Sequence, residues 1–211
     1  MTRVVNIHPE SPQPRLLAQA AEFIRDGGIV ALPTDSCYAL GCHLGDKEAL
    51  DRIRLIRQMD ERHHLTLMVR DLSEIAHFAR VDNAQYRLLK ATTPGSYTFI
   101  LEGTKELPRR VMHPKRKTIG LRVPNHPVAL ALLAELNEPL LTTTLQLPGD
   151  EVPLTEGWEI QDRLEDQIEL ILDAGHCGIE PTTIIDLTGR SPELIRAGRG
   201  ALAPFGLDLQ V

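Results

Sequence analysis

The chain has 211 residues, which is enough for one large domain with a full apolar core. Its 23 basic and 29 acidic side chains argue against a protein that coats nucleic acid or membrane with its whole surface. Three cysteines without a CxxC pair favour a reducing compartment over a disulfide framework. The sequence contains no apolar run of signal-peptide or membrane-span length, so we predict a soluble cytoplasmic protein without membrane partners.

Strands and helices alternate in the first half of the chain. Apolar residues at helical spacing from Leu16 to Ile24 predict a helix that Gly27 and Gly28 close. Asp46 can cap a second helix, and aspartates three residues before Glu74 and Gln85 are spaced like capping boxes. The predicted order is strand 4–7, the first helix, strand 29–32, the helix after Asp46, strand 65–69 and two short helices running to about 79 and 90.

Strands cluster in the second half. They are predicted at 97–101, 118–123, 140–145, 168–172, 183–187 and 194–197, with helices at 128–136 and 160–166. The loop 148–157 contains two prolines and precedes the single tryptophan, and we predict that it is a mobile lid. The pattern favours a single α/β (α+β) domain with a mixed sheet and flanking helices.

The segment 27–42, GGIVALPTDSCYALGC, has the composition of a ligand site. Strand 29–32 ends at Pro33, which biases the residue before it toward extended geometry. The hydroxyls of Thr34 and Ser36 should therefore project from a fixed strand end, where ligands of α/β sheets bind. The alternative is a strand followed by an ordinary polar turn.

Two other predicted strand ends are also rich in hydroxyl groups. They are the run Thr142, Thr143 and Thr144 and the pair Thr182 and Thr183. Because alternate residues of a strand share a face, Thr142 and Thr144 should point one way and Thr143 the other. Such a face can hold a polar ligand, although threonine is also simply a good strand former.

Two arginines lie within predicted strands. Arg122 and Arg196 have apolar neighbours, and a buried guanidinium without a partner would be costly. Each therefore needs an anion, which is either an internal carboxylate or a carboxylate or phosphate of a ligand.

One stretch of the acidic chain is strongly basic. Between Leu107 and Ala134 there is no aspartate or glutamate, and six cations are present: Arg109, Arg110, Lys115, Arg116, Lys117 and Arg122. The cluster favours binding of a polyanion, and a solvated loop is the alternative for any single lysine in it.

The cysteines do not predict a metal centre or a nucleophile. Cys37, Cys42 and Cys177 have histidines nearby in the sequence, but their spacings do not fit zinc sites and no base for a thiol is identifiable. The chain also lacks GxxxxGK[ST] and GxGxxG, so a nucleotide must be held without either phosphate loop.

Six segments together resemble one family. PTDSCYALGC, TPGSYTF, TIGLRVPNHP, PLLTTTLQLPG, PTTIIDLT and IRAG occur in the order seen in the YrdC-like threonylcarbamoyl-AMP synthases, over residues 12–205. The resemblance implies a twisted α/β domain with a concave basic groove. It also implies the joining of L-threonine, bicarbonate or CO2, and ATP with Mg²⁺ into threonylcarbamoyl-adenylate and pyrophosphate, for threonylcarbamoyl-adenosine formation in tRNA.

The resemblance also assigns residues. Thr34, Tyr38, Arg122, Thr142 and Thr182 would hold threonine, and Arg57, Thr118, Thr144, Gln146 and Arg196 would face ATP. Such a site orients a carbamate and neutralises charge, and needs no protein nucleophile. The basic residues Arg109, Arg110, Lys115, Arg116 and Lys117 would bind tRNA or double-stranded RNA.

The chain departs from the synthases at four positions. Their Lys-x-Arg pair aligns with Arg57 and Met59, and their Ser-x-Asn pair with Thr144 and Gln146. Met59 is the severe change, because a thioether replaces an arginine near the triphosphate. Arg62, His63 or His64 could compensate.

These departures are typical of the YciO-like branch, and three functions follow from this assignment. The first is a synthase of reduced activity or with another amino-acid substrate. The second is an RNA-binding module without synthase activity, and the third is a purely structural partner domain.

Overall fold

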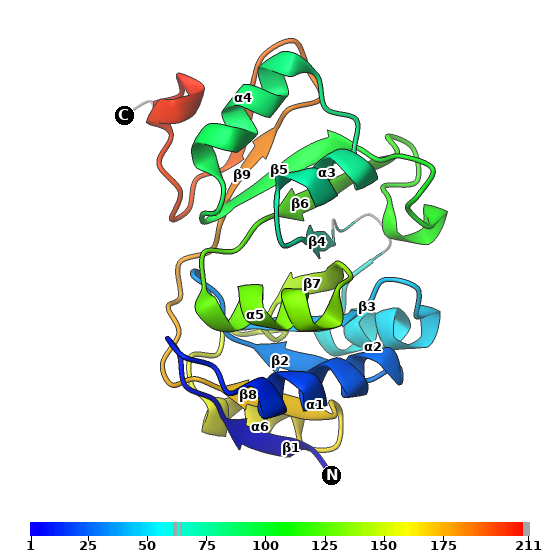
Figure 1. The fold of residues 1–211 in the computed structure, drawn as a ribbon, viewed down its shortest axis with the longest axis vertical. Helices are drawn as coiled ribbons and strands as arrows, with labels where there is room; N and C mark the ends of the chain where they lie inside the picture. The colour runs from blue at the N-terminus through cyan, green and yellow to red at the C-terminus, as the bar shows by residue number, and fades with distance from the viewer. Residues whose placement is uncertain (61–62, 64, 209–211) are drawn as a thin grey trace.

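The computed structural model describes residues 1–60, 63 and 65–208, and within them ten strands form one sheet (Figure 1). In spatial order the strands are β1 (Arg3–Asn6), β8 (Leu170–Asp173), β2 (Val30–Leu32), β3 (Ala39–His43), β7 (Leu140–Thr144), β4 (Thr66–Met68), β6 (Thr118–Arg122), β5 (Tyr97–Glu102), β9 (Thr183–Asp186) and β10 (Glu193–Arg196). The β1–β8–β2, β4–β6 and β5–β9 pairings are parallel, and the others are antiparallel. This confirms the predicted mixed sheet.

The sequence analysis assigned no strand to β3. Four of its five residues are buried, so the segment lacks the alternation that marks a half-exposed strand. Gly41 within it also has low strand propensity. β3 nevertheless pairs with β2 on one side and with β7 on the other, which places Thr144 opposite Ala39.

Helices cover both faces of the sheet. Two of them, α1 (Pro14–Arg25) and α5 (Pro127–Leu136), bury apolar residues in one cluster with β2 and β8. The other four pack on the opposite face: α2 (Lys47–Arg57), α3 (Leu72–Phe78), α4 (Asn83–Thr92) and α6 (Gly157–Leu164). Two 3₁₀ turns, η1 (Arg109–Val111) and η2 (Ala203–Phe205), complete the described elements.

Aspartates begin three of these helices, as predicted. Asp46 accepts from the Ala49 N–H at 2.8 Å, and Asp82 and Gln85 form a complete capping box. The predicted box at Asp71 is half formed. Asp71 accepts from the Glu74 N–H, but the Glu74 carboxylate accepts from the Arg70 N–H instead of from that of Asp71.

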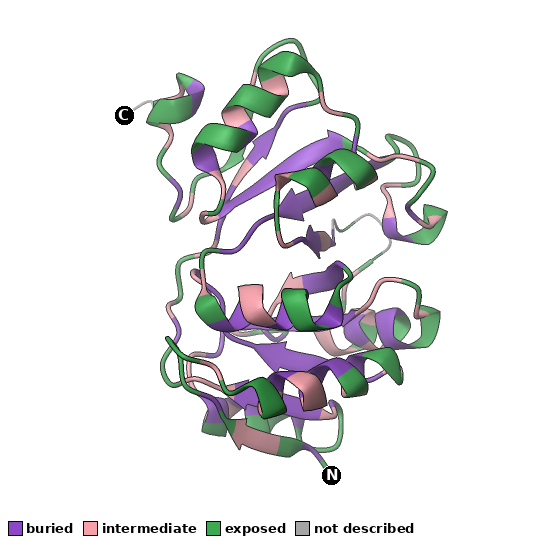
Figure 2. Ribbon diagram, in the orientation of Figure 1, coloured by how far each residue is buried: buried purple, intermediate pink, exposed green. Residues whose placement is uncertain are grey.

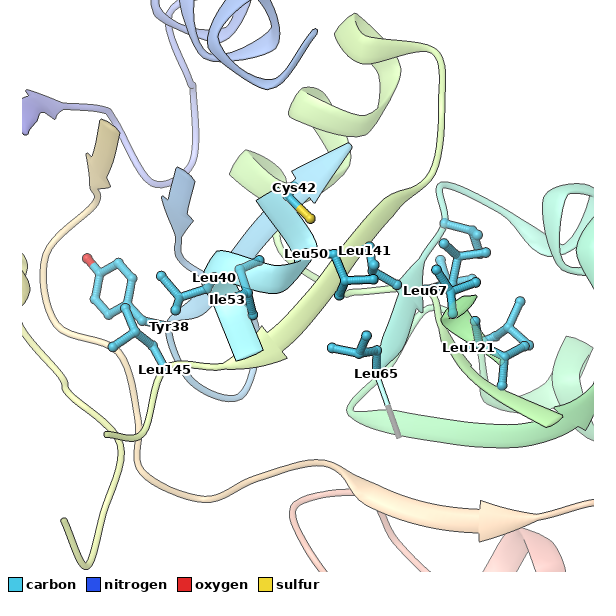
Figure 3. Packing of buried hydrophobic residues seen from close by; sticks show 14 of the residues in the cluster. Tyr38, Leu40, Cys42, Leu50, Ile53, Leu65, Leu67, Leu121, Leu141 and Leu145 are labelled. Atoms are coloured by element: carbon cyan, nitrogen blue, oxygen red, sulfur yellow. The ribbon is translucent and has the colours of Figure 1, made fainter. Parts of the chain in front are cut away.

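The larger core lies between the sheet and the α2, α3, α4 and α6 helices. Figure 3 shows side chains of β3, α2 and β7 meeting there, among them Leu40, Leu50 and Leu141. Along β7, Leu141 enters this core and Leu140 enters the cluster under α1 and α5. Both faces of the central strands are therefore covered by apolar packing, and Figure 2 shows these central strands buried while the helices expose their outer sides.

Several hydrogen bonds hold the loop 148–157, which we predicted to be a mobile lid, against the residues around it. Gln146 Nε2 donates to the Asp150 carbonyl at 2.9 Å, and Arg163 lies 3.2 Å from the Asp150 carboxylate. The Leu154 N–H donates to the Leu145 carbonyl at 2.9 Å. Among the described residues, no helix is both long and apolar enough to span a membrane.

Phe99 on β5 lies in the larger core, and its substitution tests how much this packing stabilises the protein. Its ring is fully buried and lies 5.9 Å from that of Phe205 and 5.7 Å from that of Tyr97. We expect Phe99→Ala to lower the free energy of unfolding by about 3–5 kcal/mol, because a cavity remains. Urea denaturation measures this, and Ile195→Ala, at an exposed position on β10, should change it by less than about 0.5 kcal/mol.

Candidate functional site

Strands β7, β4 and β6 carry small and polar side chains on the face of the sheet against which α1 and α5 pack, in the part that these two helices do not cover. Register and alternation place Thr142 and Thr66 beside Gly120 on this face. A Cβ at Gly120 would lie 3.0 Å from Thr98 Cγ2 and 3.5 Å from Thr66 Oγ1. The absence of a side chain at Gly120 therefore leaves space between these two threonines, and both threonines line a cavity.

This central cavity has a volume of about 440 Å³. Its lining includes eight of the residues predicted from the sequence: Tyr38, Arg57, Arg122, Thr142, Thr144, Gln146, Thr182 and Arg196. The cavity is thus lined by three guanidinium groups and several threonine hydroxyls. Among the described lining residues, Glu151 supplies the single carboxylate. The arrangement suits a polar, anionic ligand.

Arg122 is buried at the end of β6 and has an internal partner. Its Nη2 forms an ion pair with Asp35, and its Nη1 donates to Ser36 Oγ at 3.2 Å. The other Asp35 oxygen accepts from Ser96 Oγ at 2.8 Å. Burial lowers the pKa of Arg122, and the charge of Asp35 opposes that shift. Of the two partners left open by the sequence, the internal carboxylate is present.

Arg196 has no carboxylate partner among the described residues. Its guanidinium donates to the Thr182 carbonyl at 2.9 Å, and Thr182 Oγ1 lies 2.8 Å from Thr98 Oγ1. This small network fixes one wall of the central cavity. The charge of Arg196 remains uncompensated and can attract an anion.

Arg57 ends α2 and is half buried beside the cavity. Burial lowers its pKa, and its buried Nε has no hydrogen-bond partner among the described residues. The Nε of Arg122 is likewise buried without an acceptor. Two of the three arginines that line the cavity therefore keep a buried donor unused, which costs free energy until an acceptor arrives.

The threonine run on β7 splits between the two faces, as the alternation predicts. Thr142 Oγ1 donates to the Thr66 carbonyl at 3.0 Å on the cavity side. Thr143 Oγ1 contacts the sulfur of Met59 at 3.7 Å on the side of α2, although Thr143 also lines part of the cavity. Met59 packs against the large core and is not among the lining residues.

Two predicted site residues lie outside the central cavity. Thr34 uses its Oγ1 within its own loop, where it donates to the Cys37 carbonyl at 2.6 Å. It lines a neighbouring hollow of about 460 Å³, which we call the Asp35 cavity. Thr118 is buried at the start of β6, opposite Glu102. The resemblance assigned both residues to the substrate site, but neither lines the central cavity, although Ser36 of the same loop as Thr34 does.

Tyr38 lines the cavity but its hydroxyl is engaged elsewhere. The hydroxyl donates to the Gly175 carbonyl at 2.6 Å, and burial raises the pKa of this phenol. Of the three compensating residues considered for the Met59 position, His63 lines the cavity. Arg62 and His64 lie outside the described residues.

The basic stretch lies apart from the cavity. Arg109, Arg110, Lys115, Arg116 and Lys117 are all exposed, and none of them lines the central cavity. Arg110 instead donates to the Gly45 carbonyl at 2.6 Å, near the start of α2. The basic character of the groove comes from arginines on other elements.

The sequence analysis missed several lining or supporting residues. Thr66, Thr98 and Glu151 line the cavity, and Asp35 and Ser96 support Arg122. Asp35 lies between Thr34 and Ser36 in the sequence, so its place in this polar loop could have identified it as a site residue. Glu151 lies in a loop without periodicity and gave no signal.

The three thiols are free and buried. Burial raises the pKa of Cys42 to about 12 and that of Cys177 to about 11, and it also raises the pKa of Cys37. Thiolate formation at neutral pH is therefore disfavoured. Among the described residues, no group of three histidine, cysteine or acidic side chains is arranged to hold a metal ion.

Comparisons with known proteins agree with the geometry. The family described as Sua5_yciO_yrdC, telomere recombination, matches residues 22–198. The YciO protein of Escherichia coli K12 is 53% identical over 205 residues, which cover 97% of this chain and 100% of YciO. The crystal structure of E. coli YciO superposes with a TM-score of 0.94.

Two further relatives carry a named activity or ligand. The threonylcarbamoyl-AMP synthase of Chromobacterium violaceum is 31% identical over 182 residues, which cover 85% of this chain and 92% of that protein. The crystal structure of Pyrococcus abyssi Sua5 complexed with L-threonine is 28% identical, with a TM-score of 0.86. That match covers 93% of this chain and 58% of Sua5. The resemblance inferred from the sequence motifs is confirmed.

The raised thiol pKa values predict how stability depends on pH. Above the ordinary thiol pKa of 9.0, the unfolded chain loses protons that the folded chain keeps, so the free energy of unfolding falls as the pH rises. We expect Cys42 to account for about 2 kcal/mol of the fall between pH 8 and pH 11. Urea denaturation at both pH values should show a smaller fall for Cys42→Ala, and an equal fall would contradict the assignment.

Proposed function

Because the chain belongs to the Sua5/YciO/YrdC family, we propose that its central cavity binds ATP and an α-amino acid, with L-threonine as the first candidate. The product would be threonylcarbamoyl-adenylate, made from threonine, bicarbonate or CO2, and ATP, for the threonylcarbamoyl-adenosine modification of tRNA. The rate would be lower than that of the synthases.

One observation carries the proposal. Arg57, Arg122 and Arg196 line one cavity, and two of them keep a buried Nε–H without an acceptor in the part of the chain that the structure describes. Carboxylate and phosphate oxygens are the acceptors that guanidinium groups bind best. The ligand then satisfies donors that the protein leaves unpaired, and this favours binding.

The proposed reaction needs placement more than a protein nucleophile. The amine of threonine condenses with bicarbonate to give a carbamate and water. A carbamate oxygen then attacks the α-phosphorus of ATP, the bond to the β-phosphate oxygen breaks, and pyrophosphate leaves. Arg196 and Arg57 would neutralise phosphate charge, and the hydroxyls of Thr142 and Thr182 would orient the amino acid.

Mg²⁺ would come with the nucleotide. Its role is to neutralise charge on the phosphate oxygens. Glu151 is the carboxylate among the described lining residues, and Mg²⁺ in nucleotide sites needs only one or two from the protein. The residues present therefore fit an ion held mainly by the substrate.

Two features support a reduced rate. Met59 packs into the core and supplies no donor to the cavity. Gln146 lines the cavity, but its amide nitrogen is already bonded to the loop at Asp150. Loss of one donor to a developing charge typically lowers a rate by about 10²–10³.

Pyrophosphate release tests the proposed reaction. We expect slow release that needs both ATP and L-threonine, and its loss in Arg196→Gln, while Arg87→Gln on the exposed side of α4 should keep the parent rate. The quadruple variant Arg57→Lys, Met59→Arg, Thr144→Ser, Gln146→Asn should be at least about tenfold faster, because donors return. Absence of ATP binding by calorimetry with Mg²⁺ present would contradict the proposal.

A second candidate function rests on the exposed basic stretch. Among the described residues, no carboxylate forms an ion pair with this group of exposed cations, so their charges are available to phosphates: Arg109, Arg110, Lys115, Arg116 and Lys117. This favours electrostatic binding of tRNA or double-stranded RNA outside the cavity.

Salt dependence tests that candidate. If five phosphates are contacted, raising the salt from 50 to 200 mM should weaken RNA binding by about 10²–10³, and neutralising the five cations to glutamine should remove most of this dependence. A matched control neutralises five exposed cations elsewhere: Arg15, Arg87, Lys90, Lys105 and Arg190. Equal losses in the two variants, or no binding by the parent, would argue against an RNA site here.

A further inference from the structure

We propose that Asp35 is a positioning residue for Arg122, and that it makes that end of the central cavity selective for a zwitterionic amino acid over a simple anion. The proposal rests on the proposed function, because it concerns the amino-acid end of the same site. It goes beyond that function by naming the residue that sets the charge of the ligand.

The first step is geometric. Asp35 forms an ion pair with Nη2 of Arg122, and its second oxygen is held by Ser96 Oγ at 2.8 Å. Ser36 Oγ accepts from Nη1 at 3.2 Å. The side chains of Arg122 and Asp35 are 7% and 10% exposed, so both are held away from bulk water. The guanidinium therefore has a fixed orientation before any ligand enters.

The second step concerns charge. Arg122 lines the central cavity, whereas Asp35 does not, so Asp35 acts through Arg122 and through its field. The buried pair is neutral as a whole. A ligand carboxylate can still accept N–H bonds from the guanidinium, but a lone negative charge gains little from a neutral pair. A zwitterion gains more, if its carboxylate lies nearer Arg122 and its ammonium nearer Asp35, because each ligand charge is then closer to the oppositely charged member of the pair.

The third step concerns access from outside. Asp35 lines the Asp35 cavity of about 460 Å³, together with Ser96 and Arg199. Ser36 lines both cavities, so the loop at Asp35 separates them. If the carboxylate of Asp35 is removed, a small carboxylate such as formate can reach its place from this second side. This makes chemical rescue possible without blocking the central cavity.

Calorimetry at pH 7 on the full chain tests the proposal with two ligands of nearly equal shape. They are L-threonine and 2,3-dihydroxybutanoate, in which a hydroxyl replaces the ammonium group. We expect the parent to prefer threonine at least tenfold. Asp35→Asn and Asp35→Ala should each lower that preference at least tenfold. Added formate should restore it in Asp35→Ala, where the missing side chain leaves room for the small carboxylate. Asp35→Glu, which keeps the charge, should hold the preference within about threefold of the parent.

Asp51→Asn is the matched control, because Asp51 contacts Lys47 and Arg54 on the surface of α2. It should keep both affinities. If the parent binds threonine and Asp35→Asn keeps the parent preference, the inference is overturned and the proposed function stands. If the parent binds no amino acid, both are overturned.

Asp35→Asn leaves a buried guanidinium unpaired and could prevent folding. Ser96→Ala then replaces it, since this change keeps the charge of Asp35 and removes one of its anchors. We expect Ser96→Ala to weaken both ligands about three- to tenfold and to leave their ratio unchanged. Parent affinities for both ligands in Ser96→Ala would overturn the positioning role.

Discussion

The alternation of side chains along the central strands is the constraint on which this structure depends. On β7, Leu141 enters the large core while Thr142 faces the cavity. On β6, Leu121 is buried in that core while Gly120 and Arg122 face the opposite side. A strand cannot move its register by one residue without exchanging these two sets. The forces that bury the leucines therefore also hold the hydroxyls and the arginine at the cavity.

The same arrangement explains why the cavity can hold charge. Arg122 can be buried because Asp35 and Ser36 are its polar partners, and Ser96 in turn holds Asp35. Arg57 and Arg122 still keep buried donors without acceptors, and such groups reduce stability in the absence of a ligand. The protein tolerates this because the core on the other face is large and continuous (Figure 3). The larger of the two apolar cores and the cavity thus lie on opposite faces of one sheet.

Much of this could be predicted from the sequence, and the failures have physical reasons. Helix starts at Asp46 and Asp82 were found because capping is local. Five cavity residues were found because hydroxyls and arginines lie in or at the ends of predicted strands, and the other three, Tyr38, Arg57 and Gln146, came from the family resemblance. β3 was missed because burial on both faces removes the alternation signal. Pairing between distant side chains, such as Asp35 with Arg122, depends on strand order, which the sequence pattern does not state.

β4 has a mechanical consequence for the whole molecule. This strand, Thr66–Met68, has three residues and is the paired link between β7 on one side and β6 on the other (Figure 1). The cavity spans it, with Thr142 and Thr144 on one flank and Thr98 and Thr182 on the other. A ligand that touches both flanks would link the two halves of the sheet across this short strand. Filling the cavity would then stiffen the molecule along its long axis, far beyond the atoms that the ligand contacts.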